Sequence, residues 1–200
     1  SEPGSYLYCG LSRDASKEEI LERINNNTIT DILNKIEVKA GDVVMVKAGT
    51  IHAIGAGVFI CEIQQNSNCT YRMYDYDRRD KFGNPRELHV KKALDVVDNH
   101  KYIKDNKTEV VIARNEHFTE ERLVQCKYFE VYKYDVNDEA KITVDEASFV
   151  SVLFINGSGT IETDDYEKTM EFKAGDSFFV SAGLRSIIVK GQATMVVTRV

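Results

Sequence analysis

The 200-residue sequence contains no tryptophan, only two prolines and no apolar run that approaches the length of a membrane span. A transmembrane helix needs about 20 consecutive apolar residues, so membrane insertion is not expected. Positive charge is also in the minority, because 26 Lys and Arg stand against 32 Asp and Glu, which gives a net charge of −6. Nucleic-acid binding requires clustered positive charge, so a nucleic-acid partner is not expected either.

Cysteine is scarce and irregularly spaced. Cys9, Cys61, Cys69 and Cys126 include no CxxC pair, which argues against zinc-knuckle and thioredoxin-like sites. Cys61 and Cys69 lie in apolar or strand-like contexts, where free thiols are common. We therefore expect a reduced, cytoplasmic protein. The length allows one large or two small domains.

Hydrophobic periodicity predicts two short helices within residues 14–36. Ser16 and Glu19 have the spacing of a capping box, and apolar residues recur at helical spacing after them. Thr28 then offers a second cap, and apolar residues recur up to Ile36. We expect this helix pair to lie across a sheet.

The rest of the chain reads mainly as strands. Residues 37–76 are rich in Val, Ile, Phe and Tyr with glycines between, which predicts several short strands. Helical periodicity returns within 86–98. The polar, lysine-rich segment 101–108 predicts a linker, which gives domains 1–104 and 105–200. Within the second domain, turns are predicted at 156–159 and 164–165.

One segment of the chain is repeated. KAGDVVMVKAG at 39–49 resembles KAGDSFFVSAG at 173–183, with a constant offset of 134 residues and no gap. Each copy reads as a Gly-Asp turn, a short apolar strand and an Ala-Gly turn, as in a hairpin of an antiparallel barrel. Gly-Asp turns before strands also recur by chance, but an ungapped match of eleven residues favours a true repeat.

The first copy is followed by His52 and the second by Ser186 at the equivalent position. A Gly-Asp turn, a strand, a Gly and then a His is the second half of the cupin metal motif. A lone histidine after a turn is more often structural, yet a histidine needed only for packing has no reason to differ so sharply between two copies. Neutral imidazole is a suitable zinc ligand, so His52 is a candidate ligand and the second domain is predicted to be metal-free.

The remaining histidines do not complete a metal site. His89, His100 and His117 form no HxH or HExxH pattern with a nearby carboxylate. His89 falls in the predicted 86–98 helix, where a solvated or half-buried role is expected. No Gly-rich phosphate loop is present.

Residues 49–78, GTIHAIGAGVFICEIQQNSNCTYRMYDYDR, closely resemble the catalytic stretch of type I mannose-6-phosphate isomerases of the small bacterial branch, a family of the cupin superfamily. RELHVKKALD at 86–95 resembles the helix that follows it. The resemblance covers residues 1–100 well and extends more weakly to Val200. It implies a mainly β fold of jelly-roll-like, antiparallel cupin barrels, with an incomplete first barrel and a degenerate second one.

The resemblance also implies residue roles. His52 matches the last zinc ligand of the family, and Arg72 matches the catalytic arginine that faces the sugar. Glu62 matches a glutamate in the active-site barrel with a role in proton transfer, and Gln64 is expected to bind substrate. The family's other ligands, a Gln-x-His pair and a Glu, precede the matched region. We therefore expect this chain to be the C-terminal two-thirds of a longer protein, with one zinc ion in the intact parent.

Two of these assignments have plain alternatives. Ile60, Glu62 and Gln64 share one face of a predicted strand, and that face either lines the barrel or points to solvent. Arg72 either faces the sugar or pairs with a carboxylate of the charge run 75–81, which itself reads as a solvated turn.

Three functions remain open from the sequence. The first is isomerisation of mannose 6-phosphate, a small sugar phosphate, to fructose 6-phosphate by the intact parent. The second is a non-catalytic cupin module that binds a sugar or acts as a scaffold. The third is another cupin enzyme, such as a metal-dependent dioxygenase, which would need more histidines than the four present.

Overall fold

The computed structural model describes residues 1–67, 69–104, 110–163 and 166–200. The chain divides into two compact units, Ser1–Lys104 (unit 1) and Asp105–Val200 (unit 2). Strands dominate, and every pairing between named strands is antiparallel. The predicted mainly β, antiparallel fold with two short helices is therefore confirmed. Residues 105–108 of the predicted linker and the predicted turn at 164–165 lie outside the described residues.

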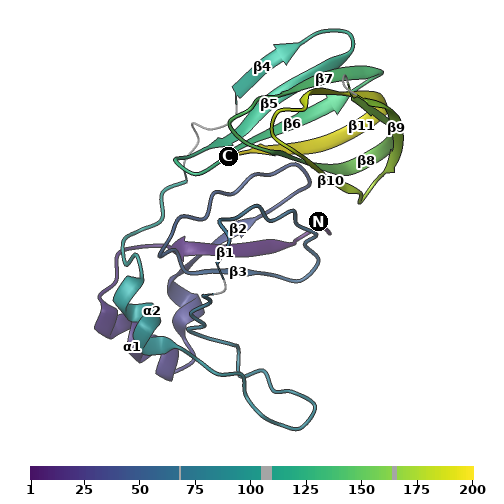
Figure 1. Ribbon diagram of the computed structural model, residues 1–200. Coiled ribbons are helices and arrows are strands. Elements are labelled where there is room, and N and C mark those ends of the chain that lie inside the picture. Colours follow the sequence, from purple (N-terminus) through teal and green to yellow (C-terminus); the bar gives the residue numbers. More distant parts are fainter. Residues whose placement is uncertain (68, 105–109, 164–165) are drawn as a thin grey trace. The chain divides into compact units, whose positions relative to one another are not determined.

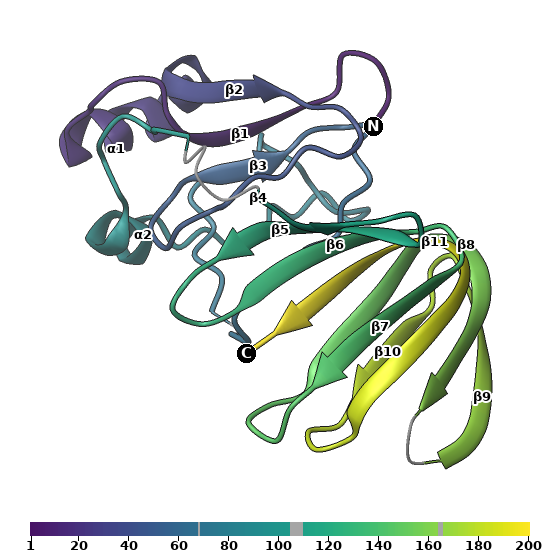
Figure 2. The ribbon, with the colours of Figure 1, turned by 90° about the horizontal axis from the view of Figure 1, so that it is seen from above.

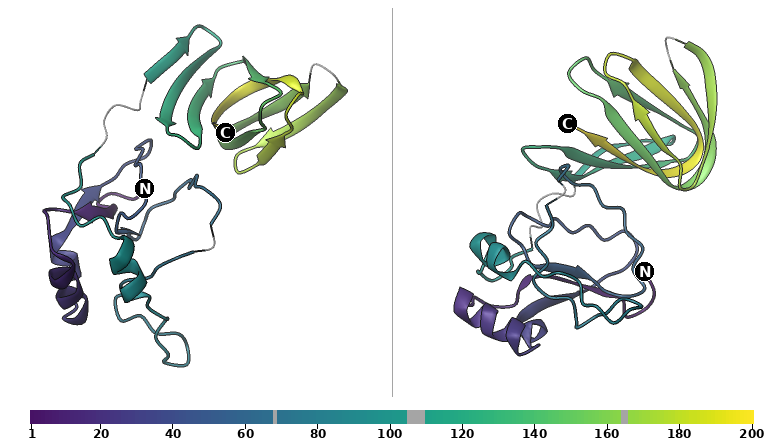
Figure 3. Two further views of the ribbon diagram at one scale, coloured as in Figure 1. Left: turned by 60° about the vertical axis from the view of Figure 1, so that its left-hand side comes forward. Right: turned by 60° about the horizontal axis from the view of Figure 1, so that its bottom comes forward.

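Unit 1 is built on a three-stranded sheet (Figure 1). β1 (Tyr6–Leu11) lies between β2 (Leu33–Glu37) and β3 (His52–Ile54). Among the described residues of 38–76, only β3 forms a strand, where several strands were expected. The chain between β3 and α2 runs as extended loops (Figure 3), because a strand forms only where a partner lies beside it.

The first helix of unit 1 forms as predicted and the second does not. α1 (Lys17–Asn25) is capped by Ser16, whose Oγ accepts a hydrogen bond from the Glu19 N–H at 3.1 Å. The second helical pattern yields one 3-10 turn, Ile29–Ile32, and then turns into β2. The apolar residues of β2 were read at helical spacing, but pairing with β1 places them in the sheet.

The second expected helix region, 86–98, is helical only in its centre. α2 spans Val90–Val96 and contacts α1. The two helices and the sheet enclose the core of unit 1, which consists of Leu11, Ala15, Ile20, Ile24, Ile29, Ile32, Leu33 and Val97. No described helix is long and apolar enough to cross a membrane.

Unit 2 is a strongly curved antiparallel sheet (Figure 2). Its strands are β4 (Val110–Arg114), β5 (Phe118–Gln125), β6 (Glu130–Val136), β7 (Glu139–Val144), β8 (Val150–Thr163), β9 (Tyr166–Lys173), β10 (Ser177–Val180) and β11 (Arg185–Arg199). The order is β10-β8-β11-β6-β5-β4, with β7 on β11 and β9 on β8.

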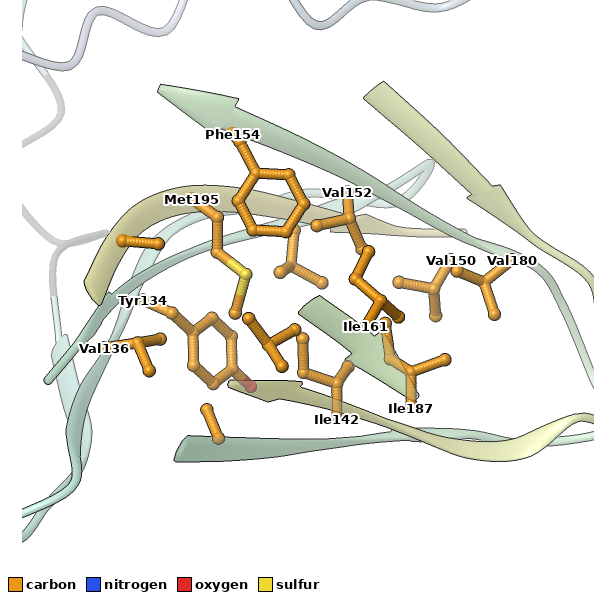
Figure 4. Packing of buried hydrophobic residues seen from close by; sticks show 14 of the residues in the cluster. Tyr134, Val136, Ile142, Val150, Val152, Phe154, Ile161, Val180, Ile187 and Met195 are labelled. Carbon is orange, nitrogen blue, oxygen red and sulfur yellow. The ribbon is translucent and has the colours of Figure 1, made fainter. Parts of the chain in front are cut away.

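The two longest strands close unit 2 around its core. β11 pairs with β7 through its first half and with β6 through its second half, while β8 follows it along nearly its whole length. The sheet therefore folds over on itself, and side chains from both layers meet inside (Figure 4). Phe154 stacks on Phe172 there, and Met195 and Val152 are fully buried.

The turn predicted at 156–159 is wrong, because these residues lie in the middle of β8. Gly157 pairs with Ala193, and Gly159 pairs with Gly191 of β11. A Cβ on Gly157 would lie 1.9 Å from the Gln192 carbonyl oxygen. The glycines thus permit close contact between two bent strands rather than a chain reversal.

Candidate active site

The repeated segment has the same backbone geometry in both units. In residues 39–49 the Lys39 N–H donates to Asp42 Oδ2 at 2.9 Å, and the equivalent bond in residues 173–183 is also 2.9 Å. The glycines at the third and eleventh positions have φ of 91° and 83° in the first copy, and of 92° and 80° in the second. The second copy leads from β9 into β10, but both strands pair with β8 and not with each other, so the predicted hairpin is wrong there. In the first copy, residues 43–47 have no strand assignment.

The positions that follow the two repeats differ in environment. His52 opens β3 opposite Cys9 and is exposed, whereas Ser186 lies in β11 with 1% of its surface exposed. The His52 Nδ1–H donates to the Thr50 carbonyl oxygen at 3.0 Å, since a carbonyl can only accept. In the neutral ring this leaves the lone pair on Nε2 free. Orientation of a ring through Nδ1–H and a backbone carbonyl is common for metal-binding histidines.

The described residues do not form a complete metal site. Among them, no group of three or more His, Cys, Asp or Glu side chains is arranged to hold a metal ion. Zinc requires three or four protein ligands, and His52 supplies one. The donor set of the described residues therefore does not fit zinc by itself.

Glu62 and Gln64 lie on the long loop that follows β3. Both side chains are exposed, whereas Ile63 between them is half-buried. The loop has no strand assignment at this point, so the expected alternation along a strand does not apply. Within the described part of unit 1, no hydrogen bond or ion pair joins His52, Glu62, Gln64 and Arg72.

Arg72 is half-buried and anchored by the segment just before α2. Its Nη1 donates to the Glu87 carbonyl oxygen at 3.1 Å. Its backbone N–H donates to His89 Nδ1 at 3.3 Å, and the His89 N–H donates to the Arg72 carbonyl oxygen at 2.7 Å. Among the described residues no carboxylate forms an ion pair with Arg72, so pairing with Asp75 or Asp77 is not seen.

Asp75 organises the charge run that was read as a solvated turn. Its side chain is only 6% exposed and lies between the guanidinium groups of Arg78 and Arg86. Arg78 Nη2 donates to Oδ1 at 2.5 Å, and Arg86 Nε donates to Oδ2 at 2.9 Å. Hydrogen bonds from Arg86 first, and then from Arg78, hold the pKa of Asp75 well below its usual range.

Asp75 and His89 are the residues that sequence reasoning missed. The nearest signal for Asp75 was the density of opposite charges around it. His89 was expected in a solvated or half-buried helical position, and it is half-buried immediately before α2. Neither pattern identifies the partner residue across the loop.

Comparison with known proteins matches both units. The family model of the mannose-6-phosphate isomerase cupin domain matches residues 119–200. The Bacillus subtilis protein YvyI is 40% identical over 190 residues, which cover 92% of this chain and 57% of that protein. Mannose-6-phosphate isomerase ManA of Bacillus subtilis is 33% identical over 193 residues, which cover 92% of this chain and 56% of ManA.

The fold is shared as well. The crystal structure of the mannose 6-phosphate isomerase from Bacillus subtilis superposes with a TM-score of 0.87 and 36% identity, over 98% of this chain and 60% of that one. The chain thus spans somewhat more than half the length of these relatives. Because the similarity extends through the His52 and Arg72 region and through unit 2, the chain belongs to the mannose-6-phosphate isomerase family.

Proposed function

We propose that the protein carrying this sequence interconverts mannose 6-phosphate and fructose 6-phosphate. The observation that carries the proposal is Arg72, a half-buried residue whose guanidinium has no carboxylate partner among the described residues. An arginine that serves stability often pairs with an acid, and Asp75 and Asp77, which follow Arg72 closely in the chain, pair with other arginines. The names of the similar proteins support the same reaction.

The chemistry suits the residues. Aldose–ketose isomerisation moves a proton between neighbouring carbons through an enediolate, so it needs a base and a fixed positive charge near the developing oxyanion. Arg72 supplies a charge that persists at every physiological pH. Glu62 is the candidate for proton transfer and Gln64 for a hydrogen bond to the sugar, and both side chains are exposed.

Zinc is part of the proposal, with His52 as one ligand. A zinc ion supplies Lewis acidity and orients sugar oxygens when bound. The free Nε2 of His52 suits this role, because its Nδ1–H is already committed to the Thr50 carbonyl. The other ligands would have to come from outside the described residues.

We propose that the ligand is a small sugar phosphate and that the protein acts in the cytoplasm. The four cysteines are free, as is usual in a reducing compartment. The net charge of −6 gives no basis for nucleic-acid binding.

The test replaces Arg72 in the protein that carries this sequence. Arg72→Ala should lower kcat for mannose 6-phosphate by about 100-fold or more, as the loss of an oxyanion-stabilising group does. Arg114→Ala is the matched control, since Arg114 is an exposed arginine on β4 of unit 2, and it should keep its activity. Coupled assays of fructose 6-phosphate formation measure both variants.

Metal analysis separates the roles of Arg72 and His52. Arg72→Ala should keep its zinc, and His52→Ala should lose it. Unchanged zinc in His52→Ala would refute the ligand assignment, and equal zinc loss in Arg72→Ala would make that arginine a structural residue. If the unaltered protein binds sugar phosphate but does not isomerise it, the non-catalytic cupin module is the better description.

A further inference from the structure

The strongest feature outside the assigned residues is the way residues 87–89 hold Arg72. Three hydrogen bonds connect them: one from the guanidinium to the Glu87 carbonyl, and two between the Arg72 and His89 positions. One of the three uses a side chain, the His89 imidazole, as the acceptor for the Arg72 backbone N–H. The backbone and the guanidinium of Arg72 are therefore fixed from the same short segment.

The rest of the loop reinforces this contact. Asp75 bonds to Arg86 across the loop, and Arg79 forms an antiparallel bridge with Pro85. Residues 72–89 thus form one hairpin-like loop, closed at its base by the Arg72–His89 pair.

The His89 ring has no role in starting α2. His89 stands at the cap position, but its side chain makes no capping hydrogen bond. Nδ1 faces the Arg72 N–H, and Nε2 lies 3.9 Å from the Glu87 carboxylate, beyond hydrogen-bond distance. The Tyr71 ring lies 6.4 Å away from the imidazole, centroid to centroid. The contact that the imidazole makes with good polar geometry is therefore the one with Arg72.

We propose that His89 is a positioning residue, whose Nδ1 fixes the Arg72 backbone so that the guanidinium points in one direction. This inference rests on the proposed function, because it matters for catalysis only if Arg72 faces the sugar. Arginine has several rotatable side-chain bonds, so its guanidinium keeps one direction only if both ends are held. His89 Nδ1 holds the backbone end, and the Glu87 carbonyl holds Nη1. A small misplacement of a catalytic group can lower the rate by about 100-fold.

The first test uses the chain itself and needs no activity. Amide hydrogen exchange at Arg72 is measured by NMR in three proteins: unaltered, His89→Leu and His89→Asn. The Oδ1 of asparagine is two bonds from Cβ, as is the Nδ1 of histidine. Asparagine can therefore restore the hydrogen-bond acceptor, whereas leucine cannot. Exchange at Arg72 should become at least about 10-fold faster in His89→Leu and return toward the original rate in His89→Asn.

Equal exchange rates in all three proteins would overturn the proposal, because the Nδ1 bond would then not protect the amide. Exchange that accelerates equally in His89→Asn and His89→Leu would also overturn it, since imidazole bulk rather than the acceptor would be required.

The second test asks whether His89 acts through Arg72. His89→Leu is combined with Arg72→Ala in a double-mutant cycle, and kcat and KM for mannose 6-phosphate are measured. His89→Leu alone should lower kcat by about 10-fold or more, with a smaller change in KM, and His89→Asn should recover most of it. In the Arg72→Ala background the same substitution should have almost no effect.

The outcomes separate the two proposals. If His89→Leu lowers kcat equally in both backgrounds, His89 acts independently of Arg72 and the positioning role is wrong. If the unaltered protein has no isomerase activity, the proposed function fails, while the exchange experiment still decides whether His89 fixes Arg72.

Discussion

At the scale of single residues, Asp75 is a buried carboxylate that lies between two guanidinium groups near the candidate site. Asp75→Asn removes the negative charge from between two guanidinium groups, so we expect a clear fall in melting temperature. Asp77→Asn is the matched control, because Asp77 is 71% exposed and its one ion pair among the described residues is with Arg79. Its melting temperature should stay almost unchanged. Circular dichroism melts at neutral pH compare the two.

The same pair of variants gives a pH test. The pKa of Asp75 is lowered in the folded protein, so its stabilising contribution is complete above its unfolded pKa of about 3.9 and disappears as pH falls through the lower folded value. The difference in melting temperature between Asp75→Asn and the unaltered chain should therefore shrink on acidification. A difference that stays constant from pH 7 to pH 3 would contradict this account.

The residues of the candidate site were predictable to different extents. His52 could be singled out from the repeat, since Ser186 replaces it in the second copy. Arg72 was identified only through family resemblance. The Asp75–Arg86 and His89–Arg72 contacts could not be predicted, because they join residues 11 and 17 apart across a loop without regular secondary structure. Local patterns do not specify such contacts.

At the scale of elements, prediction succeeded where one local signal agreed with the tertiary structure. α1 has both its cap and its apolar face in the sequence. The pattern in 29–36 suits a helix equally well, but β1 offers a partner strand and the residues of β2 pair with it. The glycines at 156–159 predicted a turn, but in the structure they lie within β8 and allow β8 and β11 to approach closely.

The role of Gly157 in the close approach of β8 and β11 can be tested with alanine substitutions at two glycines that have a similar positive φ. Gly157 and Gly175 have φ of 88° and 92°. A Cβ at Gly175 meets nothing within 4 Å, whereas at Gly157 it would meet backbone atoms of Gln192 and Ala193. Gly175→Ala should cost about 1–2 kcal/mol from strain alone. Gly157→Ala should cost about 1–3 kcal/mol more, because the strands must separate.

Chemical denaturation followed by circular dichroism measures both changes. Equal losses at the two positions would show that strain alone governs both glycines and that the β8–β11 approach is not tight.

At the scale of the whole molecule, the two units carry one repeated turn–strand–turn pattern with different outcomes. In unit 2 the segment pairs with β8 and Val180 joins the core, and the site equivalent to His52 is a buried serine. In unit 1 the same turns end in an exposed histidine on a short strand. The fold class could be predicted because turns and apolar strands repeat along the sequence. The curvature that closes unit 2 could not, because it depends on β11, whose two halves pair with β7 and β6.

That closed core has a consequence for stability at high pH. Tyr134 is 2% exposed, and its hydroxyl donates to Glu120 Oε1 at 2.6 Å. Burial first, and the bond to Glu120 second, raise the pKa of Tyr134 above its ordinary value. The folded state therefore keeps a proton that the unfolded chain loses near pH 10, so this contribution is complete below pH 10 and is lost as pH rises toward the folded pKa.

Replacing Tyr134 by phenylalanine should separate the two effects. At pH 8 the loss of the hydroxyl bond should cost about 1 kcal/mol. Above about pH 10 the unaltered chain should lose stability faster than Tyr134→Phe, by up to about 1.4 kcal/mol per pH unit for one proton. Tyr128→Phe, at a tyrosine that is 50% exposed, is the control. If urea unfolding between pH 8 and 11 gave parallel curves for all three proteins, Tyr134 would be exchanging its proton freely, and the core of unit 2 would be more open than its packing implies.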